Sequence, residues 1–281
     1  MNQADVRREP RQNGPSVFPV TCYDNYQHND IRREPRQHGS SVFHVACYDN
    51  YQHNVRFDPR VIQVHWHPES ELLRVVRSPM VVRVDNEEIQ VSPGELVYIP
   101  HGAIHSARGN GRIYYDAVVF DLSLIESSNL DESQLHIVRP VIDGSHRLPL
   151  HINPTNAFGS TVLREFDELR ASYFSRTLGF ELYVKGGLSK IISLLFAAGE
   201  RRPQHSGAHR DRRNRMKPVL NYIHNNYNEA LELDQLAGVA GVSRYHFCRL
   251  FRQITGKSPA AYVTEYRIHQ AEHMLEQSDR S

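Results

Sequence analysis

The feature that most restricts the fold of this sequence is a short apolar pattern near its C-terminus. Leu233 to Ala240 reads as a short helix with small and apolar residues on one side, and Gly241 follows where the chain must turn sharply. Ser243 then supplies an N-cap oxygen for a second helix. This spacing is typical of a helix-turn-helix, because a small residue is needed where the two helices touch.

The second of these helices has two faces of opposite character. Its apolar side chains recur at i, i+3, i+4 and i+7 and must form a core: Phe247, Leu250, Phe251 and Ile254. The opposite face carries Arg244, Tyr245, Cys248, Arg249 and Arg252. In a major groove, arginine can pair with guanine and an aromatic ring can pack on a thymine methyl group. We therefore expect Tyr245 and Arg249 to contact bases and Arg244 and Arg252 to contact phosphates. The alternative is a solvated charged face on a helical bundle.

Charge and composition agree with this prediction but add little weight. The formal net charge is +1, yet residues 200–281 carry 13 Lys/Arg against 9 Asp/Glu, while the rest carries 20 against 23. Three cysteines make no disulfide framework, which favours a reducing compartment. The start has no apolar core for a signal peptide, and the longest apolar stretch, 191–198, is too short to span a bilayer. We expect a cytoplasmic protein with no membrane partner.

The N-terminal region contains a tandem duplication. Residues 7–29 recur at 32–54 with an offset of 25 residues, and 19 of the 23 paired positions are identical. A solenoid needs at least three stacked units, so we expect one redundant copy ahead of a working one. Residues 1–30 are therefore predicted to be poorly ordered, and the second copy is the better candidate for a structured strand.

Residues 31–145 are predicted to form a β-barrel. Short apolar runs at 61–67, 80–84, 96–99 and 113–120 are separated by turn residues, and many short strands at near-even spacing are typical of a barrel or sandwich. After Pro154 the period becomes helical, which predicts a helical hairpin over 150–200 that packs on the barrel or on a second copy of the chain. Residues 201–216 are highly charged and predicted to be a linker, followed by the helix-turn-helix domain at 217–281.

Three histidines and one carboxylate are the candidate ligand-binding residues of the barrel. His65 and His67 alternate with Trp66, so both imidazoles point to one face of a strand, and Glu71 and His105 complete the set. Imidazoles and a carboxylate that converge inside a barrel suit a divalent transition metal. They can equally hydrogen-bond a small polar effector, or be satisfied by neighbouring groups with no ligand.

The C-terminal pattern resembles a known family. The stretch LDQLAGVAGVSRYHFCRLFRQITGKSPAAYVTEYRIHQAEHM, residues 233–274, looks like the first helix-turn-helix and the long connecting helix of the AraC/XylS regulators. The matching elements are the Ser-Xaa-Xaa-Xaa-Phe-Xaa-Arg-Leu-Phe core, a Gly-Xaa-Ser-Pro turn, Tyr262, Arg267 and Ala271. The resemblance implies that Tyr245, Cys248 and Arg249 face the DNA groove.

One departure from that family bears on affinity. The family has a second helix-turn-helix after the connecting helix, and this sequence stops at Ser281, where the second one would start. The resemblance therefore predicts a partial domain with fewer phosphate contacts and weaker DNA binding. It also leaves open a truncated, DNA-incompetent fragment that dimerises through residues 158–195.

The barrel residues resemble the two cupin motifs. His65 and His67 with Glu71 match His-Xaa-His followed by Glu, and Gly94 is followed six residues later by Pro-Xaa-Gly-Xaa-Xaa-His, ending at His105. Ser78 replaces the glycine usual after the first motif, and Gly109 replaces an asparagine. By resemblance these residues hold a catalytic metal in cupin enzymes and line an effector pocket in cupin-bearing regulators.

Together these patterns predict an α+β multidomain protein: a cupin-like barrel, a helical hairpin and an all-α helix-turn-helix domain. The leading hypothesis is a sequence-specific DNA-binding transcriptional regulator, not an enzyme, that responds to a small-molecule effector. Its expected partners are double-stranded DNA, the effector, a second copy of the chain and RNA polymerase, and a divalent metal in the barrel is its candidate cofactor. The alternative from another class is a cupin metalloenzyme, an oxygenase or isomerase.

Overall fold

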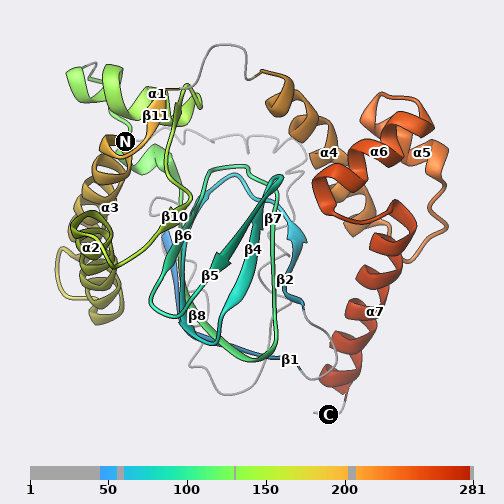
Figure 1. Cartoon of the computed structure of the whole chain (residues 1–281), viewed down its shortest axis with the longest axis horizontal. Helices are drawn as coiled ribbons and strands as arrows, with labels where there is room; N and C mark the ends of the chain where they lie inside the picture. The colour runs from blue at the N-terminus through green and yellow to red at the C-terminus, as the bar shows by residue number, and fades with distance from the viewer. Residues whose placement is uncertain (1–44, 56–59, 130, 202–206, 279–281) are drawn as a thin grey trace, which may run out of the picture.

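A computed structural model describes residues 45–55, 60–129, 131–201 and 207–278 of the chain. The prediction for residues 1–30 lies outside these ranges. A central β-barrel has a helical hairpin on one side and a cluster of four helices on the other (Figure 1). The predicted fold class is thereby confirmed. None of the helices in the described ranges combines the length and apolar character needed to cross a bilayer.

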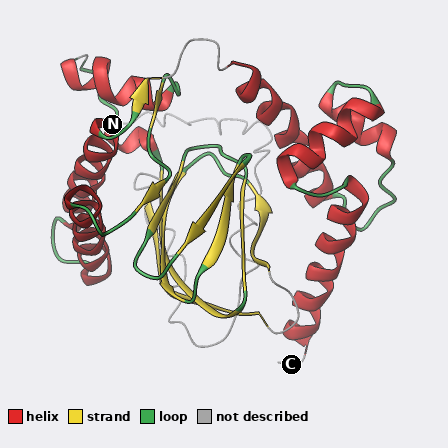
Figure 2. Cartoon of the chain, in the orientation of Figure 1, coloured by secondary structure: helices red, strands yellow, loops and turns green. Residues whose placement is uncertain are grey.

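Two antiparallel sheets build the barrel (Figure 2). The five-stranded sheet has the order β1-β8-β3-β6-β10 and the four-stranded sheet the order β2-β7-β4-β5. The strands of the first are β1 Val45–Val55, β8 Gly111–Phe120, β3 Ser70–Arg77, β6 Leu96–Ile99 and β10 His151–Ile152. Those of the second are β2 Arg60–His65, β7 His105–Gly109, β4 Met80–Val84 and β5 Glu87–Val91. As predicted, the second copy of the duplicated segment supplies a strand, β1.

Strand β3, in the middle of the five-stranded sheet, is buried on both faces. On β3, Leu72 packs toward the helical hairpin, whereas Leu73 and Val75 point between the two sheets. All three side chains are fully buried. A strand with two buried faces loses the apolar-polar alternation by which a strand is recognised, so β3 did not stand out in the sequence.

The helical hairpin consists of α2 Ala157–Ser175 and α3 Phe180–Ala197, close to the predicted stripes. Its apolar faces cover the five-stranded sheet and form one continuous core with it. A charged cluster lies under α2: the buried carboxylate of Asp116 on β8 binds Arg74 at 2.5 Å and Arg170 at 3.0 Å. Arg74 also pairs with the exposed Asp167, and both guanidinium groups lie over the ring of Phe166. Asp116 therefore ties the hairpin to the barrel.

The remaining elements before the C-terminal helices are short. A 3-10 turn at Leu122–Ile125, a π-helical turn at Gln134–Val138 and α1 Arg139–Ile142 connect the barrel to the hairpin. The two-residue strands β9 His146–Arg147 and β11 Glu200–Arg201 pair with each other.

The C-terminal helices are α4 Gly207–Asn225, α5 Leu233–Ala240, α6 Arg244–Thr255 and α7 Pro259–Ser278. The predicted helix-turn-helix is confirmed in detail. Gly241 ends α5 with a left-handed backbone at φ +63°, and the Ser243 hydroxyl accepts a hydrogen bond from the backbone N–H of His246 at the start of α6. Glycine suits the turn because other residues avoid this conformation.

The predicted linker is the main error in domain organisation. Most of residues 201–216 belong to α4, which begins at Gly207. Met216 is fully buried in the core of the helical domain, while Arg213 pairs with Asp85 of the barrel at 3.4 Å. Tertiary contacts of a few side chains therefore hold this segment in a helix, although its composition alone predicts an unstructured linker.

His224 on α4 makes the stability of the helical domain dependent on pH. Its Nε2 lies 2.7 Å from the Tyr262 hydroxyl, its ring stacks on Tyr266, and burial lowers the pKa of His224 to about 4. Because the folded pKa lies below the ordinary 6.5, the stability it confers is present above pH 6.5 and is lost as the pH falls toward 4. We expect the free energy of unfolding by urea to be lower at pH 5 than at pH 7.5 by up to about 2 kcal/mol. Partial exposure of the His224 ring to water makes the difference smaller than this upper value. His224→Gln should shrink this difference, and an unchanged difference would refute the assignment.

Candidate nucleic-acid interface and metal-binding cluster

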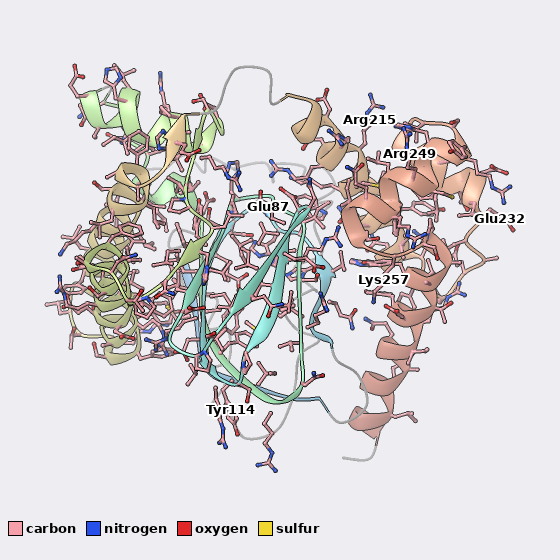
Figure 3. The ribbon with its side chains drawn as sticks, in the orientation of Figure 1. Glu87, Tyr114, Arg215, Glu232, Arg249 and Lys257 are labelled. Atoms are coloured by element: carbon pink, nitrogen blue, oxygen red, sulfur yellow. The ribbon has the colours of Figure 1, made fainter. Side chains whose placement is uncertain are left out.

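Helix α6 presents the predicted polar face to solvent. Tyr245 is 81% exposed, and Arg244, Arg249 and Arg252 are exposed as well. The opposite stripe is buried, with Phe247 and Phe251 fully enclosed. In Figure 3 the side chain of Arg249 lies on the outer edge of the helical domain. Four of the five predicted side chains thus form one accessible edge, which we call the α6 edge.

Cys248 differs from the other four. Its side chain is half-buried and packs against the apolar core of the helical domain. Its position lies at the border between the apolar stripe and the polar face, so only part of it can reach a groove.

Local contacts hold the α6 edge in place. Arg249 Nη2 lies 3.1 Å from His246 Nδ1, one turn earlier on the same helix. Arg244 lies 3.6 Å from Asp234 on α5, an exposed pair that adds little stability but restricts the side chain. Two of the side chains of the α6 edge are thereby partly ordered by neighbours within the helical domain.

One further cation beside this edge was missed in the sequence. Arg215 on α4 donates a hydrogen bond to the Gly241 carbonyl at 3.4 Å, so it lies at the turn that precedes α6. It fell within the predicted linker. The signal that could have revealed it is the apolar residue at position 216 followed by 219, 220 and 223, a helical stripe that reaches back into the charged segment.

In the barrel, all four predicted ligand residues come together. His65 lies at the end of β2 and faces His105 at the start of β7 across the sheet, while Glu71 projects from β3. The ring centroids are 4.1 Å apart for His65 and His105, 4.9 Å for His67 and His105, and 5.6 Å for His65 and His67. One Glu71 carboxylate oxygen lies 3.4 Å from His67 Nε2 and 3.5 Å from His105 Nε2.

Backbone carbonyls orient two of the imidazoles. His65 Nδ1 lies 2.8 Å from the Gln63 carbonyl and His105 Nδ1 lies 3.0 Å from the Ala103 carbonyl. Because a carbonyl only accepts, each Nδ1 carries the proton and donates it. Each Nε2 is then a lone pair available to a ligand, the arrangement that metal-binding histidines use.

The pKa values of the clustered side chains shift in different directions. Burial, reinforced by the neighbouring His105 and His67, lowers the pKa of His65 well below its ordinary value. Burial also acts against a charge on His67, but the carboxylates of Glu69 and Glu71 outweigh it and raise the pKa of His67 to about 9. Burial likewise opposes a charge on Glu71, yet His105 and His67 hold the pKa of its carboxyl below the usual range. Glu69, which lies 3.4 Å from His67 Nδ1, was not singled out in the sequence.

Comparison with known proteins places these two sites in recognised domains. A model of the bacterial regulatory helix-turn-helix proteins of the AraC family matches residues 223–264, which contain the α6 edge. The chain carries an AraC-family helix-turn-helix domain. A cupin-domain model matches residues 54–115, which contain the four clustered side chains of the barrel. The AraC-family domain therefore follows a cupin domain in the same chain.

The chain is similar to several regulators. It is 23% identical to the uncharacterized HTH-type transcriptional regulator YdeC of Bacillus subtilis over 217 residues, 76% of this chain and 73% of YdeC. It is 23% identical to YobQ of the same organism over 216 residues, 77% of this chain and 74% of YobQ. The HTH-type transcriptional activator RhaS of Yersinia pestis is 35% identical over 71 residues, 25% of this chain and 26% of RhaS. The first two similarities extend well beyond the AraC-family domain.

The cupin cluster fits a small cation better than an organic molecule. The ligand atoms of His65, His67 and His105 all lie within 4.8 Å of one another, a spacing that one ion with bonds of about 2.1 Å can bridge after small shifts. His105 Nε2 is buried and makes no hydrogen bond. The ring separations leave no room between the imidazoles for a sugar-sized ligand. Three imidazoles with a carboxylate beside them are a donor set that suits zinc, manganese or iron, and His67, whose pKa is about 9, must give up its proton to an ion that binds there.

Proposed function

We propose that this chain is a sequence-specific DNA-binding transcriptional regulator that reads a major groove with the α6 edge. The observation that carries this proposal is the exposure of Tyr245 and Arg249 on a helix whose other side is buried. An accessible edge with cationic and aromatic side chains has the chemistry needed to contact both base edges and phosphates. Arg215, beside the turn, adds a further cation for the DNA backbone.

The cupin barrel serves as the sensor in this proposal. His65, His67 and His105 hold a divalent transition metal, with Glu71 as a fourth ligand or as a carboxylate beside it. A small-molecule effector then binds at or beside the metal. The support is the convergence of the donor atoms and the backbone hydrogen bonds that turn two Nε2 atoms toward a common point.

The α2–α3 hairpin is the proposed contact between two copies of the chain. The loop between these helices and the first turns of α3 expose Leu178, Leu182 and Tyr183, by 107%, 75% and 52% respectively. Apolar side chains gathered at one end of a hairpin are typical of an interaction surface. A dimer would carry two α6 edges and could span two half-sites on DNA.

The test of DNA reading is Arg249→Ala. We expect this variant to lose about 1–3 kcal/mol of binding free energy for a duplex selected from a random pool, and to lose preference at one base position. Fluorescence anisotropy at fixed salt measures both, because salt changes the nonspecific component. The matched control is Arg112→Ala, which removes an exposed arginine from the barrel. Equal weakening by both variants, or equal affinity for random and selected duplexes, would refute base reading.

A cupin metalloenzyme is the second candidate, favoured by the buried His and Glu cluster. It predicts turnover of a small molecule by metal-loaded protein, as an oxygenase or isomerase, and loss of that turnover in His67→Ala. Regulation predicts instead that metal or effector alters DNA affinity. The named relatives are regulators, and the two measurements separate the candidates on the same protein sample.

A further inference from the structure

The strand that carries the histidine pair also forms part of the surface on which the helical domain rests. His65 points into the cluster, while its neighbours Val64 and Trp66 face the other way. Val64 belongs to a single apolar core with Met216, Val219 and Leu220 of α4, and Trp66 packs against that core. On the paired strand, Ile104 precedes His105 and enters the same core. Each of these two histidines is thus next in sequence to a residue in the domain interface.

Polar contacts fix this interface at the same strand. The indole N–H of Trp66 donates to the Asn221 side chain at 3.1 Å, and the ammonium of Lys217 lies 4.4 Å from the centre of the indole ring. The Tyr262 hydroxyl donates to the backbone carbonyl of Val64 at 2.9 Å. That carbonyl belongs to the peptide bond that joins Val64 to His65. A displacement of the His65 backbone therefore moves the atom that accepts the hydrogen bond of Tyr262.

A second set of contacts reaches the end of the DNA-reading helix. Arg83 on β4 donates to the Gln253 carbonyl in the last turn of α6 at 2.6 Å. Asp85 accepts the backbone N–H of Ile104 at 3.1 Å and pairs with Arg213 of α4 at 3.4 Å. The contacts of Trp66, Val64, Arg83 and Asp85 with the helical domain are called the interdomain clamp below.

We propose that the interdomain clamp couples occupancy of the histidine cluster to DNA binding, through strand β2. This inference rests on the proposed function, because it concerns regulation of that site. A cation that draws three imidazoles together must shift β2 and the start of β7. Packed interfaces respond to small shifts by changing between discrete arrangements, so the helical domain is reoriented or released.

The experiment measures coupling in both directions on the full chain. The probes are Zn²⁺ alone and a labelled duplex selected from a random pool. We expect saturating Zn²⁺ to change the Kd for the duplex by at least about 5-fold, and saturating duplex to change the Kd for Zn²⁺ by the same factor, since coupling is reciprocal. Trp66 is the only tryptophan in the chain, so its emission reports directly on the clamp during either titration.

The decisive variant combines Asn221→Ala with Arg83→Met, which removes two clamp contacts and leaves the histidines and the α6 edge intact. We expect it to bind both probes with less than about 2-fold coupling. The matched control combines Asn225→Ala with Arg108→Met, which alters exposed residues of the same helix and the same sheet. The control should keep the wild-type coupling. Wild-type coupling in the clamp variant, or Zn²⁺ binding that leaves DNA affinity unchanged, would overturn the inference.

Failure of the metal site gives a different result. If Zn²⁺ does not bind, the proposed sensor is wrong, and a double-mutant cycle then tests the clamp alone. His67→Gln and the clamp variant should change DNA affinity non-additively by about 5-fold if β2 links the sites. Effects that add within about 2-fold would overturn the inference. Thermal unfolding of each variant verifies that all of them fold.

Discussion

Replacing His105 with alanine is expected to weaken Zn²⁺ binding by roughly 100-fold or more, because even residues behind the metal ligands typically contribute 10–100-fold. The substitution removes one of three converging nitrogen donors and leaves Glu71 with a single imidazole at about the same distance. Calorimetric titration of chelator-treated protein measures the affinity. The same variant should keep its helical circular dichroism, because His105 contributes no apolar packing to the domain cores.

The control for this prediction is His136→Ala. His136 is exposed and pairs only with Glu132 within the described contacts, so its loss should leave Zn²⁺ affinity unchanged. Zinc binding of wild-type strength in His105→Ala would show that the cluster is a structural group of hydrogen-bonded side chains and no metal site. Equal losses in both variants would point to scattered surface histidines as the binding groups.

Replacing Asp116 with alanine is expected to destabilise the chain by about 3–5 kcal/mol, the range found when one partner of a buried ion pair is removed. Asp116 is 1% exposed and binds two guanidinium groups, those of Arg74 and Arg170. Without it, both cations lie over Phe166 with no buried carboxylate between them. Urea unfolding at neutral pH measures the loss of stability. We expect the barrel and the hairpin to unfold in one transition.

Asp167→Ala provides a control within the same charged cluster. Asp167 also pairs with Arg74, but its side chain is 54% exposed, so we expect a loss of no more than about 1 kcal/mol. The comparison separates the effect of burial from the effect of charge, because each variant removes one carboxylate that pairs with Arg74 and only Asp116 is buried. Similar losses in the two variants would show that Asp116 is not the central link between barrel and hairpin.

The helix-turn-helix could be predicted from the sequence because its determinants are local. Gly241, Ser243 and the stripe that starts at Phe247 act over a few residues, and each has one structural role that its chemistry favours. The pairing of His65 with His67 could also be predicted from the sequence, because alternation on a strand places the two side chains on one face.

Other features depend on contacts between distant segments. The start of α4 has almost no apolar side chains to reveal a helix, and it contacts partners such as Asp85, which lies more than 120 positions earlier in the chain. Strand β3 shows no alternation because both of its faces are buried. The placement of Trp66 against Asn221 has no sequence signal, since a lone tryptophan on a strand can face either side.

The same limit applies within the candidate sites. The sequence predicted which residues would converge in the barrel, but the orientation of the His65 and His105 rings depends on hydrogen bonds to the backbone carbonyls of Gln63 and Ala103, which the residue pattern does not show. Likewise Cys248 was placed on the exposed face by its position in the helical period, whereas core side chains cover part of it. The helical period predicts on which face of a helix a side chain lies, and packing determines how much of that side chain is buried.

Strand β1 is built by the second copy of the duplicated segment, and this has a genetic consequence. Residues 22–29 and 47–54 have the same sequence, so deletion of one 25-residue unit joined within this stretch would stay in frame and leave the sequence of β1 unchanged except for Thr in place of Ala46. Recombination between the two repeats in the gene would therefore shorten the protein without changing the edge of its sheet.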